Sequence, residues 1–419
     1  MSSFVPAPGD AGPAFALVGR VLDRGGASTP GAVIVAGGRV AAVETDADDP
    51  RLPPHRWHAA YVAAGFVDLQ VNGGFGHEVG GDPAALRALA AKLPSTGVTA
   101  FLPTLVSGAA EAYAASLATI DEVRLEGARG DAPASARILG VHLEGPLLST
   151  ARAGAHARSA IEAATPSLVD GLADPARVRL VTLAPERPGA LELIRRLRAR
   201  GITVSLGHTD ASFQAFTSGV DAGATVATHL WNAMSPFHHR APGAAGAALF
   251  DDRVVALAIA DGIHVHPAAF AVALRAKGLD RLALVTDAIA GAGLGPGPST
   301  LAGQAVTIDE TGARLSDGTL AGSTLALDQA VRNAARFAEL SPAEAVHLAS
   351  TVPARVLGLA AASSPLRPGS AADLVLLDEQ LIVQATFVGG HLAFLRDGAA
   401  GMLGSVTLAE APGSEVNRS

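Results

Sequence analysis

The sequence predicts an α/β protein: a (β/α)8 TIM-like barrel with a small β-sandwich domain formed by both chain ends. Three observations predict this fold. Eight short apolar runs alternate with helical stretches between residues 62 and 286. Histidine or acidic residues follow several of these runs, and the carboxyl ends of barrel strands are where such folds carry their chemistry. Short strand-like runs separated by turns occupy both ends of the chain.

The composition is that of a chain with a large core. It has 419 residues, of which 49% are hydrophobic and 17% charged, which suits a barrel of the ~250-residue kind plus a smaller domain. The formal net charge of -8 argues against nucleic acid as a general partner. Cysteine is absent, so disulfides are impossible and any metal must be bound by histidine and carboxylate side chains.

The sequence carries no targeting signal that we recognise. Residues 1–10 have neither a basic cluster nor an apolar core of signal-peptide length. No apolar run approaches the ~20 residues that span a bilayer. We therefore expect a cytoplasmic protein without a membrane partner.

The small domain is expected to combine both chain ends. Residues 14–18, 32–36 and 39–43 are strand-like, and Gly37-Gly38 is a hairpin signal. Residues 374–377 and 386–388 are also strand-like. If these strands pair with the first set, residues 1–61 and 359–419 form the small domain, and residues 62–358 form the barrel.

The barrel is expected to contain eight parallel strands joined by right-handed helical crossovers. The strands are expected at residues 62–71, 97–105, 137–143, 178–183, 203–206, 225–228, 254–259 and 282–286. Helical stretches fill most gaps, for example residues 83–93, 108–126, 190–200 and 267–277. The Gly- and Pro-rich run 291–300 lacks the GxGxxG spacing, so we expect a mobile loop there and no dinucleotide site.

Three strand ends carry residues that suit a metal ion. His208 and His229 each follow an apolar run, and Glu144 precedes Gly145-Pro146 at a strand-to-loop break. Each of them alone is more often an ordinary loop residue. Together, two imidazoles and one carboxylate suit zinc or another borderline divalent ion with an open position for water.

Asp287 directly follows the last expected strand. An aspartate there is either the N-cap of a helix or a catalytic base. The run after it, Ala-Ile-Ala-Gly-Ala-Gly, is a poor helix former, so a cap has little to stabilise. This favours the interpretation of Asp287 as a base.

A set of motifs carries a resemblance to a known family. In chain order they are GFVDLQVNGG, HLEGPLLS, GAH, LGHTDAS, THLWNAMSPFHHRAPG, ADGIHV, LVTDAIAGAG and LAGSTLALDQAVRN. With them the sequence resembles the N-acetylglucosamine-6-phosphate deacetylases of the amidohydrolase superfamily, from about residue 62 to about residue 378. HLEGP and THLWNAM are the specific motifs, whereas the ending PGSAADLVLLD is shared by many amidohydrolases.

The resemblance implies a metal-dependent barrel hydrolase, usually a homodimer. Its substrate would be a phosphorylated amino sugar, N-acetylglucosamine-6-phosphate, and its products glucosamine-6-phosphate and acetate. One divalent metal ion, zinc first and iron, cobalt or manganese as alternatives, would be bound by Glu144, His208 and His229. Asp287 matches the general acid/base, and His156 matches the residue that polarises the acetyl carbonyl.

The resemblance also implies a set of substrate contacts. Arg240 would bind the phosphate, because a guanidinium can donate to two phosphate oxygens at once. The segment 320–322 would close over the sugar, and the neighbouring His238 and His239 have no firm role. The complete set is Ala155, His156, Asn232, Ala233, Arg240, His264, Leu320, Ala321 and Gly322.

Gln70 and Asn72 depart from the wider superfamily. Many members carry His-x-His at this place and bind two metals, whereas amide side chains are poor ligands for a transition metal. One metal is therefore expected, and a second, weakly bound ion near Gln70 and Asn72 is left open.

Two other functions and one substrate choice are left open by the sequence. The chain could be another amidohydrolase that acts on a cyclic or acylated amide, or a non-catalytic barrel that binds sugar phosphates. Within the deacetylase hypothesis, glucosamine is not distinguished from galactosamine.

Overall fold

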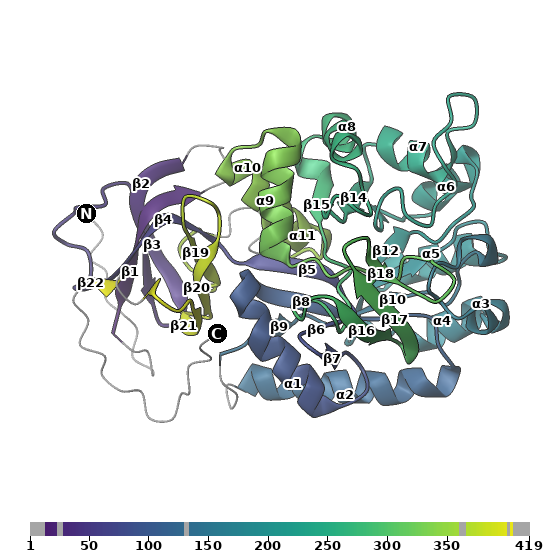
Figure 1. Ribbon diagram of the computed structural model, residues 1–419, viewed down its shortest axis with the longest axis horizontal. Helices are drawn as coiled ribbons and strands as arrows, with labels where there is room; N and C mark the ends of the chain where they lie inside the picture. Colours follow the sequence, from purple (N-terminus) through teal and green to yellow (C-terminus); the bar gives the residue numbers. More distant parts are fainter. Residues whose placement is uncertain (1–12, 23–27, 130–133, 360–365, 400–402, 405–419) are drawn as a thin grey trace.

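The computed structural model describes residues 13–22, 28–129, 134–359, 366–399 and 403–404. A β-sheet domain lies beside a larger α/β barrel, and the strands of the β-sheet domain come from both ends of the chain (Figure 1). Among these residues, no helix combines the length and apolar character needed to cross a lipid bilayer.

The small domain is an eight-stranded sheet that joins the two chain ends. Its order is β21-β20-β19-β4-β1-β2-β3, and β22 pairs with β4. The pairing of β19 with β4 is antiparallel, with Leu374 opposite Ala64, as expected for a domain formed by both ends. The strands are β1 (Phe15–Leu22), β2 (Ser28–Ala36), β3 (Arg39–Glu44), β4 (His55–Ala64), β19 (Leu374–Leu377), β20 (Val383–Val388), β21 (His391–Leu395) and β22 (Leu403–Gly404).

The barrel contains all eight expected parallel strands, in the order β15-β14-β13-β12-β11-β10-β8-β5. An isolated parallel bridge between Val71 and Ala288 brings the first strand to the chain just after the last one. The predicted (β/α)8 fold is thus confirmed as a nearly closed barrel. Its strands are β5 (Phe66–Val71), β8 (Val98–Leu105), β10 (Val141–Glu144), β11 (Val178–Leu183), β12 (Thr203–Leu206), β13 (Val226–Ala227), β14 (Val255–Ala258) and β15 (Leu282–Leu284).

The barrel strands are almost continuously buried, because helices cover their outer face and side chains fill the interior. Every residue of β5, β8, β10 and β12 is buried. The helices are α1 (Pro83–Lys92), α2 (Ala110–Arg129), α3 (Arg158–Ala163), α4 (Pro166–Leu172), α5 (Ala190–Ala199), α6 (Phe213–Asp221), α7 (Gly243–Phe250), α8 (Pro267–Lys277), α9 (Leu327–Ala338), α10 (Pro342–Ala349) and α11 (Thr351–Val356), with short 3-10 turns η1 (Leu93–Thr96), η2 (Thr150–Arg152) and η3 (Leu279–Arg281).

Three local expectations were wrong. The expected strand 62–71 is two strands, β4 and β5, which belong to different sheets and meet at Gly65. The expected strand 137–143 divides into β9 (Arg137–Ile138) and β10. The run 291–300 is not all loop, because its last residues form β16 (Gly297–Leu301). The domain limits 1–61, 62–358 and 359–419 stay a prediction.

A small antiparallel sheet forms a separate layer beside the barrel strands (Figure 1). It consists of β16, β17 (Gln304–Asp309) and β18 (Gly312–Arg314). Its apolar side chains pack with Ile289, just after Asp287. A two-stranded hairpin, β6 (Gly73–Gly74) and β7 (His77–Glu78), follows the first barrel strand.

Gly65 allows the chain to pass from the small sheet into the barrel without a loop. A Cβ atom at this position would lie 2.2 Å from the Thr99 Cγ2 atom and 2.3 Å from its Oγ1 atom. We therefore expect Gly65→Ala to lower the free energy of unfolding by ~1–3 kcal/mol, the usual cost of overpacking. Urea denaturation of the variant and the wild type measures this difference in free energy of unfolding. Gly81→Ala is the control, since a Cβ there meets no atom within 4 Å; equal stability of the two variants would contradict the prediction.

Candidate active site

Four side chains converge at the carboxyl ends of the barrel strands. Glu144 is the last residue of β10, His208 and His229 lie two residues beyond β12 and β13, and Asp287 lies three residues beyond β15. The φ angles of His208, His229 and Asp287 are 45°, 24° and 51°. This left-handed region is unfavourable for residues other than glycine, and such strain gathers at functional sites.

The Glu144 carboxylate is the centre of the cluster. Its Oε1 atom lies 3.0 Å from His229 Nε2, 3.3 Å from His208 Nε2 and 2.9 Å from Gln70 Nε2. Glu144 is only 2% exposed. Burial opposes ionisation, but the adjacent His156, His208 and His229 rings hold the pKa of Glu144 well below its usual value.

The three candidate ligand atoms are spaced as a metal ion requires. His208 Nε2 and His229 Nε2 lie 3.0 Å apart, and both lie within 3.3 Å of Glu144 Oε1. Tetrahedral zinc with bonds of ~2.0–2.1 Å separates its ligands by about 3.3–3.4 Å. The His208 Nδ1–H donates to the Arg152 carbonyl oxygen at 2.9 Å, which leaves the Nε2 lone pair facing the cluster. The residues present therefore fit a divalent metal ion.

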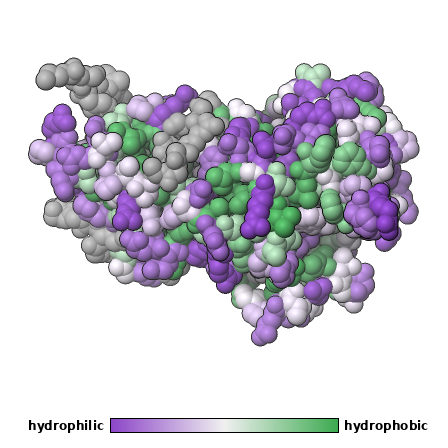
Figure 2. All heavy atoms as spheres, turned by 90° about the horizontal axis from the view of Figure 1, so that it is seen from above, coloured by the Kyte–Doolittle hydropathy of each residue, from purple (hydrophilic) through white to green (hydrophobic). Residues whose placement is uncertain are grey.

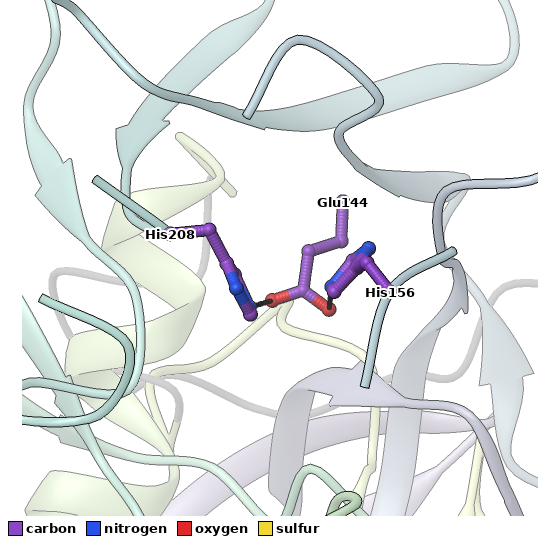
Figure 3. A group of neighbouring side chains, drawn as sticks. All are labelled: Glu144, His156 and His208. Atoms are coloured by element: carbon purple, nitrogen blue, oxygen red, sulfur yellow. Dashed lines mark ion pairs between the residues drawn. The ribbon is translucent and has the colours of Figure 1, made fainter. Parts of the chain in front are cut away.

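His156 joins the same cluster from the loop after η2. Glu144 lies between His156 and His208, and the three side chains offer ligand atoms within 4.8 Å of one another (Figure 3). The Ser107 backbone N–H, however, donates to His156 Nδ1 at 3.1 Å. Since Nδ1 is then an acceptor, the neutral ring carries its proton on Nε2. This favours His156 as a hydrogen-bond donor to substrate and His229 as the third metal ligand.

Asp287 is held by two amide side chains. Gln70 Nε2 and Asn72 Nδ2 donate to its Oδ1 atom at 3.1 and 2.7 Å. Burial, and next the Glu144 carboxylate, raise the pKa of Asp287 to about 6. A carboxyl group with such a pKa can exchange a proton near neutral pH.

A cavity of about 340 Å³ gathers most of the sequence-predicted residues. Besides the cluster, it is lined by predicted substrate contacts from four separate segments of the chain. The predicted residues that line it are Glu144, Ala155, His156, His208, His229, Asn232, Ala233, His264, Asp287, Leu320 and Gly322.

Two predicted residues do not line this cavity. Arg240 is exposed and lies outside its lining, in the same exposed turn as His238 and His239. Ala321 is fully buried and packs in the apolar cluster under β16–β18, so its neighbours Leu320 and Gly322 face the cavity instead.

Two residues of the site, Arg152 and Ser107, were not expected from the sequence. Arg152 lines the cavity and forms an ion pair with Asp210 at 2.8 Å. The position of Arg152 between Glu144 and His156 in the chain was the available signal. Ser107, which orients His156, follows the end of β8, and that strand end carries no charged residue to attract notice.

Comparison with known proteins identifies the family of this chain. The model of the amidohydrolase family matches residues 61–393. The chain belongs to the amidohydrolase family. A human N-acetylglucosamine-6-phosphate deacetylase is 41% identical over 81% of this amidohydrolase and 84% of the human protein. An N-acetylgalactosamine-6-phosphate deacetylase from Escherichia coli O157:H7 is 38% identical over 80% of this chain and 88% of its own.

Solved structures of deacetylases also match this chain. A mutant N-acetyl-D-glucosamine-6-phosphate deacetylase from Mycobacterium smegmatis, in complex with N-acetyl-D-glucosamine-6-phosphate, matches with a TM-score of 0.82 and 35% identity. The match covers 91% of this amidohydrolase and 100% of that chain. The N-acetylglucosamine-6-phosphate deacetylase from Thermotoga maritima matches with a TM-score of 0.80 and 33% identity, over 90% and 98% of the two chains.

The cluster predicts how metal content depends on single histidines. We expect His208→Ala to lose most of its bound divalent metal after dialysis, because two ligands remain where three are needed. His238→Ala should keep the wild-type content, since this exposed histidine lies outside the cavity lining. Inductively coupled plasma mass spectrometry on both purified variants measures this. Full metal content in His208→Ala would exclude His208 as a ligand.

Proposed function

We propose that this amidohydrolase hydrolyses the N-acetyl group of N-acetylglucosamine-6-phosphate to give glucosamine-6-phosphate and acetate. The observation that carries the proposal is the meeting of Glu144, His208 and His229 with Asp287 in one cavity. The substrate follows from the names of relatives that cover four fifths of the chain, including human and Bacillus subtilis deacetylases. Because one relative is named for the galactosamine compound, the 4-epimer is the competing substrate.

Glu144, His208 and His229 would hold one divalent metal ion, for which we propose zinc. Two neutral imidazoles and a carboxylate are a ligand set that zinc accepts with one position left open. When bound, such an ion acidifies water and polarises a carbonyl group. Gln70 and Asn72 offer amide donors to carboxylates, so we assign no second ion to them.

Asp287 would carry the proton through the reaction. As ionised base it accepts a proton from the attacking water while the new C–O bond forms at the acetyl carbon. As acid it then gives this proton to the nitrogen as the C–N bond breaks. An amine leaves only when protonated, so the second transfer releases the free amino sugar phosphate and acetic acid, which then loses its proton to give acetate.

His156 would stabilise the oxygen of the acetyl group. Its Nδ1 accepts the Ser107 N–H, so its Nε2–H is available for a carbonyl oxygen that gains negative charge. Burial, and next the nearby His208 ring, lower the pKa of His156 to about 4. The ring therefore stays neutral at physiological pH and keeps the tautomer that donates from Nε2.

The phosphate requires positive charge in an acidic protein. Arg152 and His264 line the cavity and can supply hydrogen-bond donors to a phosphate. His264 Nδ1 lies 2.6 Å from an oxygen of Asp261, which leaves its Nε2 for the substrate. Arg240 keeps its proposed role only if its exposed turn moves or a second chain contributes it.

We propose a cytoplasmic homodimer. Hydrophobic patches lie between hydrophilic ones over the barrel half of the molecule when it is seen from above (Figure 2). Phe250 on α7 and Val272 on α8 are 76% and 51% exposed. Exposed apolar side chains that form a contiguous patch favour a protein contact.

Acetate release from a panel of sugars tests the function. We expect metal-dependent release from N-acetylglucosamine-6-phosphate that a chelator abolishes. The unphosphorylated sugar should react ~10–100-fold less efficiently in kcat/KM, because charge-assisted hydrogen bonds to the phosphate are lost. Arg152→Ala and Arg240→Ala, compared on both sugars, show which arginine causes this preference. No release from either the phosphorylated sugar or its 4-epimer would exclude the proposal.

Asp287→Asn separates binding from turnover. We expect kcat to fall by ~10²–10⁴, the usual contribution of general acid–base catalysis, while KM changes little. In the wild type the base must be ionised, so kcat/KM should decline as pH falls, with an apparent pKa no higher than about 6. Steady-state kinetics from pH 4.5 to 8 measures both effects. Near-normal kcat in the variant would exclude Asp287 as the proton carrier.

A further inference from the structure

Gln70 and Asn72 occupy the end of β5 and point amide groups at the acidic residues of the site. Gln70 is fully buried and Asn72 is 4% exposed. Their side chains donate to Glu144 and Asp287, the proposed metal ligand and the proposed proton carrier. Neutral amides add no charge to the cavity, so their effect on these acids is exerted through hydrogen bonds alone.

The orientation of the Gln70 amide is determined by Thr228. The Thr228 hydroxyl donates to Gln70 Oε1 at 2.7 Å, so the NH2 group must face the other way. Its two N–H bonds are then divided between Glu144 Oε1 at 2.9 Å and Asp287 Oδ1 at 3.1 Å. A flipped amide would place its oxygen against two carboxylates and lose all three hydrogen bonds. Gln70 is thus a rigid bridge between the two acids.

Asn72 is aimed at the same oxygen of Asp287. Its Nδ2 donates to Oδ1 at 2.7 Å. Within the described part of the chain, its own Oδ1 atom is buried without a hydrogen-bond partner. The hydrogen bond to Asp287 is therefore the one that the Asn72 side chain makes to the described residues.

The two Oδ atoms of Asp287 are consequently not equivalent. Among the described residues, both amide donors go to Oδ1 and none goes to Oδ2. The backbone supports the same arrangement, because the Asp287 N–H donates to the Gln70 carbonyl at 3.0 Å and the Ser323 N–H donates to the Asp287 carbonyl at 2.8 Å. These bonds hold the left-handed backbone of Asp287 in place.

We propose that Gln70 and Asn72 are positioning residues that bind Oδ1 of Asp287 and leave Oδ2 as the oxygen that takes and gives the proton. The bridge through Gln70 also sets the distance between this proton carrier and the metal ligand Glu144. The inference rests on the proposed role of Asp287. The proposal thus gives a function to Gln70 and Asn72, near which the sequence left open a second, weakly bound metal ion.

Three variants of Asn72 and a control test the role of the donor. Asn72→Ala should lower kcat ~10–100-fold through loss of a hydrogen bond to a charged group, with KM and metal content unchanged. Asn72→Asp keeps the shape but replaces the donor by an acceptor, and should lower kcat further. A role in packing alone predicts the opposite order, because the isosteric variant would then be the better enzyme. Asn72→Leu, similar in volume and without a donor, should behave like Asn72→Ala.

Gln384→Ala is the matched control for loss of an amide donor. Gln384 Nε2 donates to an Asp378 oxygen at 2.9 Å in the small domain, far from the cavity lining in sequence and in the fold. This variant should keep wild-type kcat. Gln70→Ala should lower kcat as Asn72→Ala does, provided that circular dichroism shows an intact fold. Unchanged kcat in both Asn72→Ala and Gln70→Ala would overturn the proposal while the deacetylase function stood.

Infrared spectroscopy tests the positioning independently of any substrate. The difference spectrum between wild type and Asp287→Asn isolates the Asp287 carboxylate bands. The same difference, recorded with Asn72→Ala in both proteins, should show these bands shifted, because a donor to Oδ1 has been removed. A protein that released no acetate would refute the proposed function, and the band shift would still decide whether the amides hold Asp287. Unshifted bands would overturn the positioning role.

Discussion

The buried carboxylate of Glu144 is the constraint on which the site depends. An ionised group that is 2% exposed is costly unless other groups compensate its charge and donate hydrogen bonds to its oxygens. Here Gln70 and three histidine rings surround it, each from a different strand end or loop. A divalent cation at this place would compensate the carboxylate directly, which explains why two ring nitrogens face each other only 3.0 Å apart.

The closure of the barrel places Asp287, the proposed proton carrier, beside this cluster. β5 and the chain after β15 meet through the bridge of Val71 and Ala288, so Gln70 and Asp287 become neighbours although they are 217 residues apart in sequence. The hydrogen bonds that close the barrel also hold Asp287 in its strained backbone conformation. The same hydrogen bonds therefore close the barrel and position Asp287.

The loop from η2 to His156 serves several parts of the site together. The Arg152 carbonyl selects the His208 tautomer, the Arg152 guanidinium lines the cavity, and His156 lies edge-on to the His208 ring at 4.3 Å. Gly154 permits this close approach, since a Cβ atom there would lie 3.1 Å from the His208 ring. Changes in this loop would therefore affect the proposed metal ligand His208 and the proposed substrate contacts together.

The sequence by itself determined the strand–helix alternation, the strand ends that carry Glu144, His208, His229 and Asp287, and the family. These features are local or rest on motifs, because an apolar run and the residue that ends it are adjacent in the chain. Only the tertiary structure decided which side chains face one another. Gly65 divides one apolar run between two sheets, Ser107 sets the tautomer of His156, and Arg240 lies outside the cavity that Arg152 lines. Each of these depends on contacts between distant segments, and such contacts leave no pattern in neighbouring residues.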